Sequence, residues 1–430
     1  MVPFKFRALE VHSSYAWDFR WIRKALGFIR AQGLNALVLH RNDIVDQVVY
    51  PAKFFGGSEA PRNIFERYQE IHRALYKYTP TRRSGPYLRR DYLKRVVDLA
   101  ARDGIAVWLE NKELTFPDIF LELNPQLVKD GHVCPNDPFW WDFIDRKYVE
   151  LFQDIPGIAG IITAPGTGES RLAISSNRCQ CELCQGVMPT QWYTKLLLIM
   201  HRPIRTAGRE LAVRDFVFDR KAHDELAQAM RALPDDVIIS FKSTPHDYYP
   251  TFPDNPRLGQ VGAHRQWLEY DCMGQYFGWG VAPAIMIEDM RGRLSRGAAL
   301  GVEGMILRTD WESLDGHTAF DTPNRINLHA GAALLRDLDA PAPTIFRAWL
   351  EETGQLRADA SESERADATA WAERLLGGSW EITRRALYLN DCVFSDATLF
   401  PVSLAHAWWL AEEKNSLSNC PGWSICGDGY

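Results

Sequence analysis

The sequence has no long apolar run and no long basic run. Behind its short basic start, residues 1–7, there is no apolar stretch of the kind that a secretory signal needs, and no segment reaches the roughly 18 apolar residues of a membrane span. The basic patch with which nucleic-acid-binding proteins neutralise phosphates is also missing, and the formal net charge is -6. We therefore expect a soluble, cytoplasmic protein that binds neither nucleic acid nor a membrane.

Cysteine is sparse, with 8 residues in a chain of 430. This density is far below that of small secreted domains held together by disulfides. Three cysteines nevertheless cluster, because Cys179, Cys181 and Cys184 form a C-x-C-x-x-C pattern. Zinc accepts three such thiolates, with Cys134, His132 or a water as the fourth ligand. The pattern leaves three alternatives open, which are a structural zinc site, reduced thiols packed in a loop, and a disulfide.

The composition is that of a globular protein. Hydrophobic residues make up 46% and charged residues 24%, so the chain can bury a large core and disorder is not expected. The length suits one large barrel with an appended piece, or two ordinary domains. There are 15 tryptophans, whose flat apolar faces suit either core packing or the faces of sugar rings.

Short β-rich runs alternate with amphipathic helical stretches along most of the chain. Eight strands are predicted, at 6–11, 36–40, 106–110, 157–163, 211–218, 237–242, 266–272 and 304–308. Helices are predicted at 19–32, which ends at Gly33, and at 90–102, 137–153, 189–205, 221–233 and 289–300. Eight such units predict an α/β fold, a (β/α)8 TIM barrel over residues 1–335.

An open, doubly wound sheet is the alternative fold. No G-x-G-x-x-G motif follows the first strand, which counts against a dinucleotide-binding version of that sheet. After Ile326 the pattern changes, and residues 336–430 are predicted to form a helical C-terminal segment packed on the barrel. Its helices are expected at 344–353, 361–376 and 380–389, with an irregular end at 415–430.

Acidic residues gather at the predicted carboxyl ends of the strands, where TIM barrels carry their chemistry. Glu169, Asp247 and Glu269 have the most suggestive surroundings, after the fourth strand, after the sixth and on the seventh. Hydrolysis of a glycosidic bond needs one protonated carboxyl as the acid and one ionised carboxylate as base or nucleophile. The competing interpretation of each residue is an ordinary helix cap or a solvated surface carboxylate.

Several of these stretches resemble the family-67 α-glucuronidases. VIISFKSTPHDYYP (237–250) and QWLEYDCMGQ (266–275) resemble the two segments that carry the carboxylates of that family's catalytic base, and GTGES (166–170) resembles the place of its acid glutamate. LAVRDFVFD (211–219) resembles the strand of that family that carries an arginine. Trp17-Asp18 and then LNALVLHRND (34–43) resemble the family's first two strands. The resemblance is patchy and spans roughly residues 6–340.

The resemblance implies an inverting, exo-acting α-glucuronidase-like enzyme that needs no cofactor for catalysis. Glu169 would be the general acid, Asp247 and Glu269 would together activate water, and Arg214 and Lys242 would hold the uronate carboxylate. Pro165 stands where the family has a further lysine, which puts glucuronate recognition in doubt. The alternative for Arg214 and Lys242 is internal salt bridges, in which case the substrate is a neutral sugar.

Further polar and aromatic residues follow the predicted strands. The candidates for contact with an oligosaccharide substrate are Trp17, His40, Glu110, Tyr276, Arg308 and Asp310, and Trp17, Trp279 or Trp311 could stack on a sugar. Two rival functions remain, a non-catalytic carbohydrate-binding barrel and a metal-dependent hydrolase. The absence of H-x-H and H-E-x-x-H patterns weakens the second rival. The oligomeric state is left open, and a homo-oligomer is possible.

Overall fold

The computed structural model describes most of the chain. The described residues are 4–51, 54, 80–117, 120–121, 124–129, 131–167, 169–216, 220–245, 247–276, 278, 280–312, 314, 316–389, 392–393, 402–406 and 409. Trp279 and the expected irregular end at 415–430 lie outside them. Among the helices of the described part, none is both long and apolar enough to cross a membrane. The cytoplasmic location stays a prediction.

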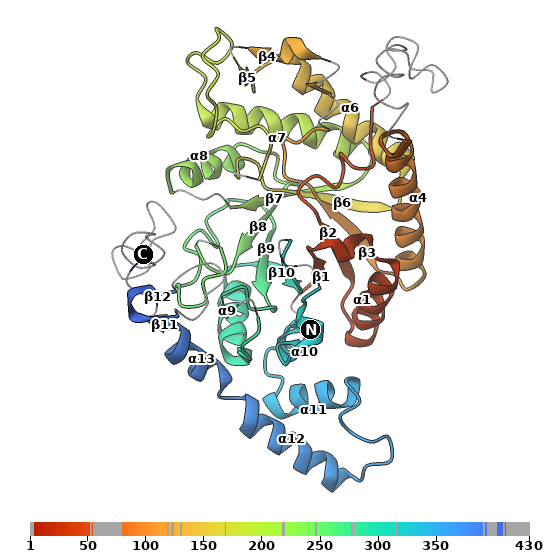
Figure 1. Ribbon diagram of the computed structural model, residues 1–430, viewed down its shortest axis with the longest axis vertical. Helices are drawn as coiled ribbons and strands as arrows, with labels where there is room; N and C mark the ends of the chain where they lie inside the picture. Colours follow the sequence, from red (N-terminus) through yellow and green to blue (C-terminus); the bar gives the residue numbers. More distant parts are fainter. Residues whose placement is uncertain are drawn as a thin grey trace. The chain divides into compact units, whose positions relative to one another are not determined.

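Eight strands close into a barrel (Figure 1), in the order β1-β10-β9-β8-β7-β6-β3-β2. They are β1 (Phe6–Val11), β2 (Ala36–His40), β3 (Ala106–Glu110), β6 (Ile158–Thr163), β7 (Glu210–Asp215), β8 (Ile238–Lys242), β9 (Gln266–Asp271) and β10 (Val302–Arg308). The neighbouring pairs β1–β10, β10–β9, β3–β6 and β6–β7 run parallel. The predicted (β/α)8 TIM barrel is confirmed, and the open doubly wound sheet is excluded.

The strands are buried because helices cover a parallel barrel outside and side chains fill it inside. Both β8 and β9 are buried along their whole length. Close packing also fixes small residues in the sheet. A Cβ at Gly304 would lie 2.3 Å from the Phe6 carbonyl oxygen across the β1–β10 pair, so only glycine fits there.

Two compact units make up the chain, which we call the first unit (residues 1–37 and 240–430) and the second unit (residues 38–239). The boundaries fall inside β2 and β8, so the division cuts through barrel strands. The predicted boundary after residue 335 is a different one and stays a prediction.

The second unit carries a series of packed helices and a small hairpin. Its helices are α4 (Pro80–Arg102), η3 (Pro125–Leu127), α6 (Pro138–Asp154), α7 (Pro189–Thr206) and α8 (Arg220–Arg231). Helix α7 packs against both α6 and α8. The short strands β4 (Val128–Lys129) and β5 (His132–Val133) pair antiparallel just before α6. The sequence did not predict this hairpin, because two-residue strands have no readable periodicity.

The first unit carries the remaining helices. These are η1 (Ser14–Trp17), α1 (Phe19–Gln32), α9 (Ile287–Ala299), η4 (Ala319–Asp321), α10 (Arg325–Leu334), α11 (Ala342–Glu352), α12 (Glu362–Leu376) and α13 (Ser379–Leu387). Helix α1 has the predicted bounds, since Asp18 caps its first turn and Gly33 ends it at φ 68°.

Two details of the C-terminal part differ from the prediction. Helix α10 was not predicted, because it is buried almost all round, Asn327 and His329 included, and therefore lacks a polar face at the helical period. The last predicted helix ends at Leu387 instead of Leu389, since β11 (Tyr388–Leu389) pairs with β12 (Cys392–Val393). Helices α10, α11 and α12 pack in sequence (Figure 1).

Candidate active site

Asp247 lies in the loop that follows β8, in the first unit. Its Oδ1 contacts the Lys242 ammonium, and its Oδ2 contacts the Tyr276 hydroxyl. Its backbone φ is 45°, which non-glycine residues rarely adopt and which costs free energy that the surroundings must offset. An ammonium group and a hydroxyl donor both favour the ionised carboxylate. Lys242 and Tyr276 are thus both hydrogen-bond donors to the Asp247 carboxylate, and its backbone adopts a conformation that is uncommon for a residue other than glycine.

Glu269 lies on β9, next to β8 in the barrel, and is fully buried. Its two carboxylate oxygens each accept a hydroxyl hydrogen bond, Oε1 from Ser240 over 2.6 Å and Oε2 from Tyr248 over 3.0 Å. The Ser243 N–H donates to the Glu269 carbonyl over 3.0 Å, which fixes the loop after β8 against β9. Asp247 thus follows β8 and Glu269 lies on the neighbouring strand β9, and each carboxylate contacts a side chain of β8, Lys242 for Asp247 and Ser240 for Glu269.

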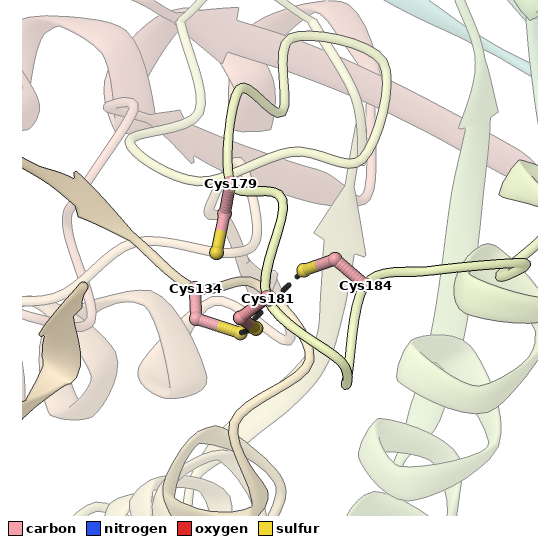
Figure 2. A group of neighbouring side chains, drawn as sticks. All are labelled: Cys134, Cys179, Cys181 and Cys184. Atoms are coloured by element: carbon pink, nitrogen blue, oxygen red, sulfur yellow. Dashed lines mark hydrogen bonds between the residues drawn. The ribbon is translucent and has the colours of Figure 1, made fainter. Parts of the chain in front are cut away.

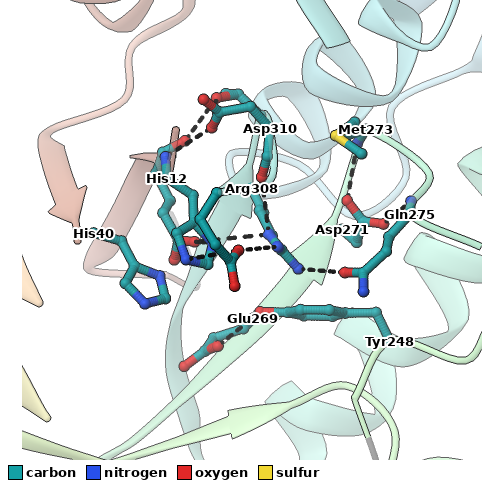
Figure 3. A network of polar contacts seen from close by, with 12 residues as sticks. His12, His40, Tyr248, Glu269, Asp271, Met273, Gln275, Arg308 and Asp310 are labelled. Carbon is teal, nitrogen blue, oxygen red and sulfur yellow. Dashed lines mark hydrogen bonds and ion pairs between the residues drawn. The ribbon is translucent and has the colours of Figure 1, made fainter. Parts of the chain in front are cut away.

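Arg308, at the end of β10, is the centre of a buried polar network in the first unit (Figure 3). Its guanidinium donates to Gln275 Oε1 over 2.8 Å and to the Asp310 carbonyl over 3.0 Å, and it lies 5.0 Å from the centre of the Tyr248 ring. Burial alone would lower the pKa of Arg308, but Tyr248, Asp271 and nearby glutamates raise it above its usual value. Arg308 is therefore a permanent cation.

Asp271 and Asp310 hold loops at the mouth of the barrel. Asp310 is fully buried and accepts the backbone N–H groups of His12 and Ser13 over 2.7 and 2.9 Å. Asp271 accepts three backbone N–H groups from the loop that follows it, those of residues 273–275. Burial raises the pKa of Asp271, although Arg308 and these N–H groups oppose the shift. In this structure Asp310, predicted to contact substrate, holds two loops together.

Negative charge exceeds positive charge in this part of the first unit. The acidic residues are Glu10, Asp247, Glu269, Asp271, Asp310 and Glu312, whereas Lys242 and Arg308 are the permanently charged bases among them. His12 lies between two of the acids, with Nε2 3.1 Å from Glu312 and Nδ1 3.6 Å from Glu10. An excess of carboxylates suits chemistry in which positive charge develops on the substrate.

Arg214, Glu110 and His40 form a buried cluster in the second unit. Glu110 Oε1 accepts a hydrogen bond of 2.6 Å from the Arg214 guanidinium and lies 3.0 Å from His40 Nε2. Arg214 has 2% of its side chain exposed, and the other two have none. The side chains of these three candidates lie together, and the Arg214–Glu110 pair is an internal salt bridge, the alternative that the sequence left open for Arg214.

Glu169 follows β6 in the second unit and contacts the ammonium group of Lys112, which follows β3. The glutamate side chain is 25% exposed, whereas that of the lysine is 3% exposed. The contact favours an ionised Glu169, because a buried ammonium group attracts a carboxylate. The basic residue Lys112 thus lies at the candidate acid, although Pro165 stands where the family-67 pattern has a lysine.

Sequence reasoning did not assign roles to several partners of these carboxylates, namely Lys112, Ser240, Tyr248 and Gln275. The signal for Tyr248 was its place directly after Asp247, in the Asp-Tyr-Tyr run. Ser240 lies two residues before Lys242 on β8, so alternation puts both side chains on one face of the strand. Trp17 and Trp311, candidates for stacking, are both half-buried.

The four cysteines Cys134, Cys179, Cys181 and Cys184 lie together in the second unit (Figure 2). Cys134 follows β5, and the other three lie in the loop between β6 and α7. Of the fourth ligands that the sequence left open, the structure brings Cys134 to the cluster. This group of residues could hold a metal ion.

Comparison with known proteins leaves the family open. No family model matches the sequence, and no curated protein sequence matches it. Among solved structures, a GH138 enzyme targeting pectin rhamnogalacturonan II aligns with 92% of this chain at a TM-score of 0.56 and 12% identity. A β-N-acetylhexosaminidase from Bacteroides fragilis aligns with 82% of this chain at a TM-score of 0.48 and 12% identity. A GH20 exo-β-N-acetylglucosaminidase from Vibrio harveyi aligns with 88% of this chain at a TM-score of 0.48 and 11% identity.

These likenesses concern the fold. The alignments cover 45%, 70% and 59% of those three proteins, so this chain spans less than half the length of the GH138 enzyme. At 12% identity the match to that enzyme shows a shared TIM-barrel fold. The match to the GH138 enzyme does not support assignment of this chain to family 67.

Proposed function

We propose that this protein is a glycoside hydrolase that acts by general acid and base catalysis. The observation that carries the proposal is the pair Asp247, just after β8, and Glu269, on the neighbouring strand β9, two carboxylates that are each held by hydrogen-bond donors. Catalytic groups of TIM barrels lie at the carboxyl ends of the strands. The fold that this chain shares with a GH138 enzyme is consistent with the same class of reaction.

In this proposal Asp247 is the base that takes a proton from the attacking water. A base must be ionised before it acts, and the contacts from Lys242 and Tyr276 keep Asp247 in that form. Glu269, which accepts hydrogen bonds from Ser240 and Tyr248, supplies a second negative charge. Both charges would stabilise the oxocarbenium-like transition state of glycoside cleavage.

Glu169 is the proposed general acid, which gives its proton to the leaving oxygen. Its contact with Lys112 means that the free protein favours the ionised form. We infer that Lys112 turns away from Glu169 when substrate binds, so that the glutamate can hold a proton. Inversion at the anomeric carbon is proposed from the resemblance to family 67, and it requires that the acid and base leave room for a water between them.

The first proposed substrate is an oligosaccharide that contains a uronic acid. Arg214 and Lys242 match the basic residues of the family-67 pattern, and an arginine fork suits a carboxylate. The GH138 enzyme with the shared fold targets a pectin, rhamnogalacturonan II. In this reading the substrate carboxylate would compete with Glu110 for Arg214.

A neutral sugar is the second candidate, and the internal salt bridges favour it. Arg214 is bound to Glu110, and Lys242 is bound to Asp247. The surplus of carboxylates in the first unit would also repel an anionic substrate. Under this alternative Arg214 holds Glu110, Lys242 holds the proposed base Asp247, and neither basic residue contacts a uronate.

The experiment is to incubate the protein with matched oligosaccharides that differ only in carboxylate or hydroxymethyl at one ring, and to quantify the released sugars. We expect release from at least one member by the native chain, and release at least about 100-fold slower by Glu269→Gln. Preference within each pair decides between the two substrate classes. Binding of sugars without release by the native chain would contradict hydrolysis and indicate a carbohydrate-binding barrel.

A further inference from the structure

Two separate segments of the second unit meet at the four cysteines. Cys134 lies between the β4–β5 hairpin and α6, and Cys179, Cys181 and Cys184 lie in the loop that leads from Glu169 to α7. Figure 2 shows the four sulfur atoms turned toward one another. The segments are 45 residues apart or more along the sequence, so the tertiary structure brings the fourth thiol to the C-x-C-x-x-C pattern.

The four sulfur atoms are close enough for one metal ion to bind them all. All four sulfur atoms lie within 4.8 Å of one another, and Cys134 Sγ is 3.4 Å from Cys181 Sγ and 3.5 Å from Cys184 Sγ. Tetrahedral zinc with Zn–S bonds of about 2.3 Å places its sulfur ligands roughly 3.8 Å apart. A disulfide would join two of the sulfurs at about 2.05 Å and leave the other two unused.

Donors from the surrounding chain point at these sulfur atoms. The Asn136 side-chain amide donates to Cys184 Sγ over 3.3 Å. Backbone N–H groups two residues further along donate to three of the thiols, from Asn136 to Cys134, from Cys181 to Cys179 and from Leu183 to Cys181. Such outer donors orient and stabilise thiolate ligands at metal sites.

Two tryptophans of the neighbouring helices hold the turn that presents Cys134. Trp140 Nε1 donates to the Cys134 carbonyl over 2.9 Å, and Trp192 Nε1 donates to the Pro135 carbonyl over 3.0 Å. The turn that presents Cys134 is therefore fixed by α6 and α7 before any ion binds.

We propose that Cys134, Cys179, Cys181 and Cys184 together bind one structural zinc ion. Each thiol gives its proton to solvent as its sulfur bonds to the metal. Four protein ligands close the coordination sphere, so the ion has no open position for a substrate. Its effect is to tie the loop that carries Glu169 to the start of α6. This inference concerns metal binding alone and does not depend on the proposed hydrolase activity.

The test is the metal content of the purified full chain, measured by mass spectrometry of the elements, together with maleimide labelling of its cysteines. We expect one zinc ion per chain and slow labelling of the four residues. After removal of the metal, labelling should become fast, and zinc chloride alone should restore both zinc content and protection. Zinc far below one ion per chain before and after this treatment would overturn the proposal, as would iron in its place or a disulfide among the four.

Variants separate the ligands from other cysteines. Cys134→Ser should lose bound zinc, whereas Cys272→Ser, which changes a buried cysteine of the first unit, should keep one ion per chain. Equal zinc in Cys134→Ser and the native chain would contradict the assignment. If Cys134→Ser does not fold, Asn136→Ala keeps all four ligands, and we expect it to bind zinc about 10- to 100-fold more weakly. Unchanged affinity in that variant would count against the site.

Discussion

The Tyr248 hydroxyl donates a hydrogen bond to Glu269 Oε2 over 3.0 Å, while the ring of the same tyrosine lies 4.4 Å from the Lys242 ammonium. Lys242 in turn contacts Asp247. One aromatic side chain thus contacts one carboxylate of the proposed base and the cation that holds the other. A change at Tyr248 should therefore affect the catalytic pair without removing either carboxylate.

Tyr248→Phe should lower kcat roughly 10- to 100-fold with little change in KM, because a hydrogen bond to a charged group is worth about 1.5–3 kcal/mol. The matched control is Tyr270→Phe. Tyr270 lies on β9 next to Glu269, but its hydroxyl donates over 2.6 Å to Asp289 on α9. Steady-state kinetics of both variants check the prediction, and an equal loss in both would show that Tyr248 has only a structural role.

Lys112→Met should move the alkaline limb of the pH profile of kcat/KM, which reports on the free protein, to higher pH. The ammonium of Lys112 favours the ionised form of Glu169, so its removal helps the proposed acid to keep its proton. Lys195→Met, which changes an exposed lysine of α7, serves as the control and should leave the profile unchanged. An alkaline limb that stays in place in Lys112→Met would indicate that another group is the acid.

Glu169→Gln should distinguish leaving groups. A good leaving group departs without a proton, so an activated aryl glycoside should keep most of its turnover while a natural linkage loses about 10²- to 10⁴-fold. The ratio of kcat/KM for the two substrates, compared between the native chain and the variant, is the measurement. Equal losses on both substrates would contradict the acid role.

His329 on α10 should make folding stability depend on pH. Burial lowers its pKa despite the contact with Glu352, so the folded protein holds His329 neutral while the unfolded chain takes up a proton below about pH 6.5. The contribution of neutral His329 to the free energy of unfolding is therefore present at neutral pH. It is lost as pH falls, by up to about 1.4 kcal/mol for each pH unit. Urea unfolding at about pH 7.5 and about pH 5.5 should show a smaller drop for His329→Gln than for the native chain. An identical drop would refute the assignment.

The fold could be predicted from the sequence because most strands and helices have a characteristic spacing of hydrophobic residues and recognisable residues at their ends. The bounds of β1, β2, β3 and α1 agree with the prediction, and Gly33 ends α1 as expected. Helix α10 was not predicted because a helix that is buried on nearly every side has no amphipathic period. Local periodicity therefore sets the limit of what such reasoning finds.

The candidate site was only partly readable. Strand ends located the carboxylates, but the sequence does not show which neighbour each one contacts. Asp310 accepts N–H groups from residues almost three hundred positions away, and Glu169 contacts a lysine more than fifty residues before it. Contacts of this kind depend on how the barrel brings distant loops together, which no local pattern encodes.

The most direct test of the account is a double-mutant cycle on Asp247 and Glu269, with turnover at saturating substrate and binding of the same oligosaccharide measured for each variant. If the two carboxylates act as one base, Asp247→Asn and Glu269→Gln should each lower kcat about 10²- to 10⁴-fold while binding persists, and the double variant should lose little more than the worse single one. Fully additive losses, or turnover that survives either change, would contradict the claim.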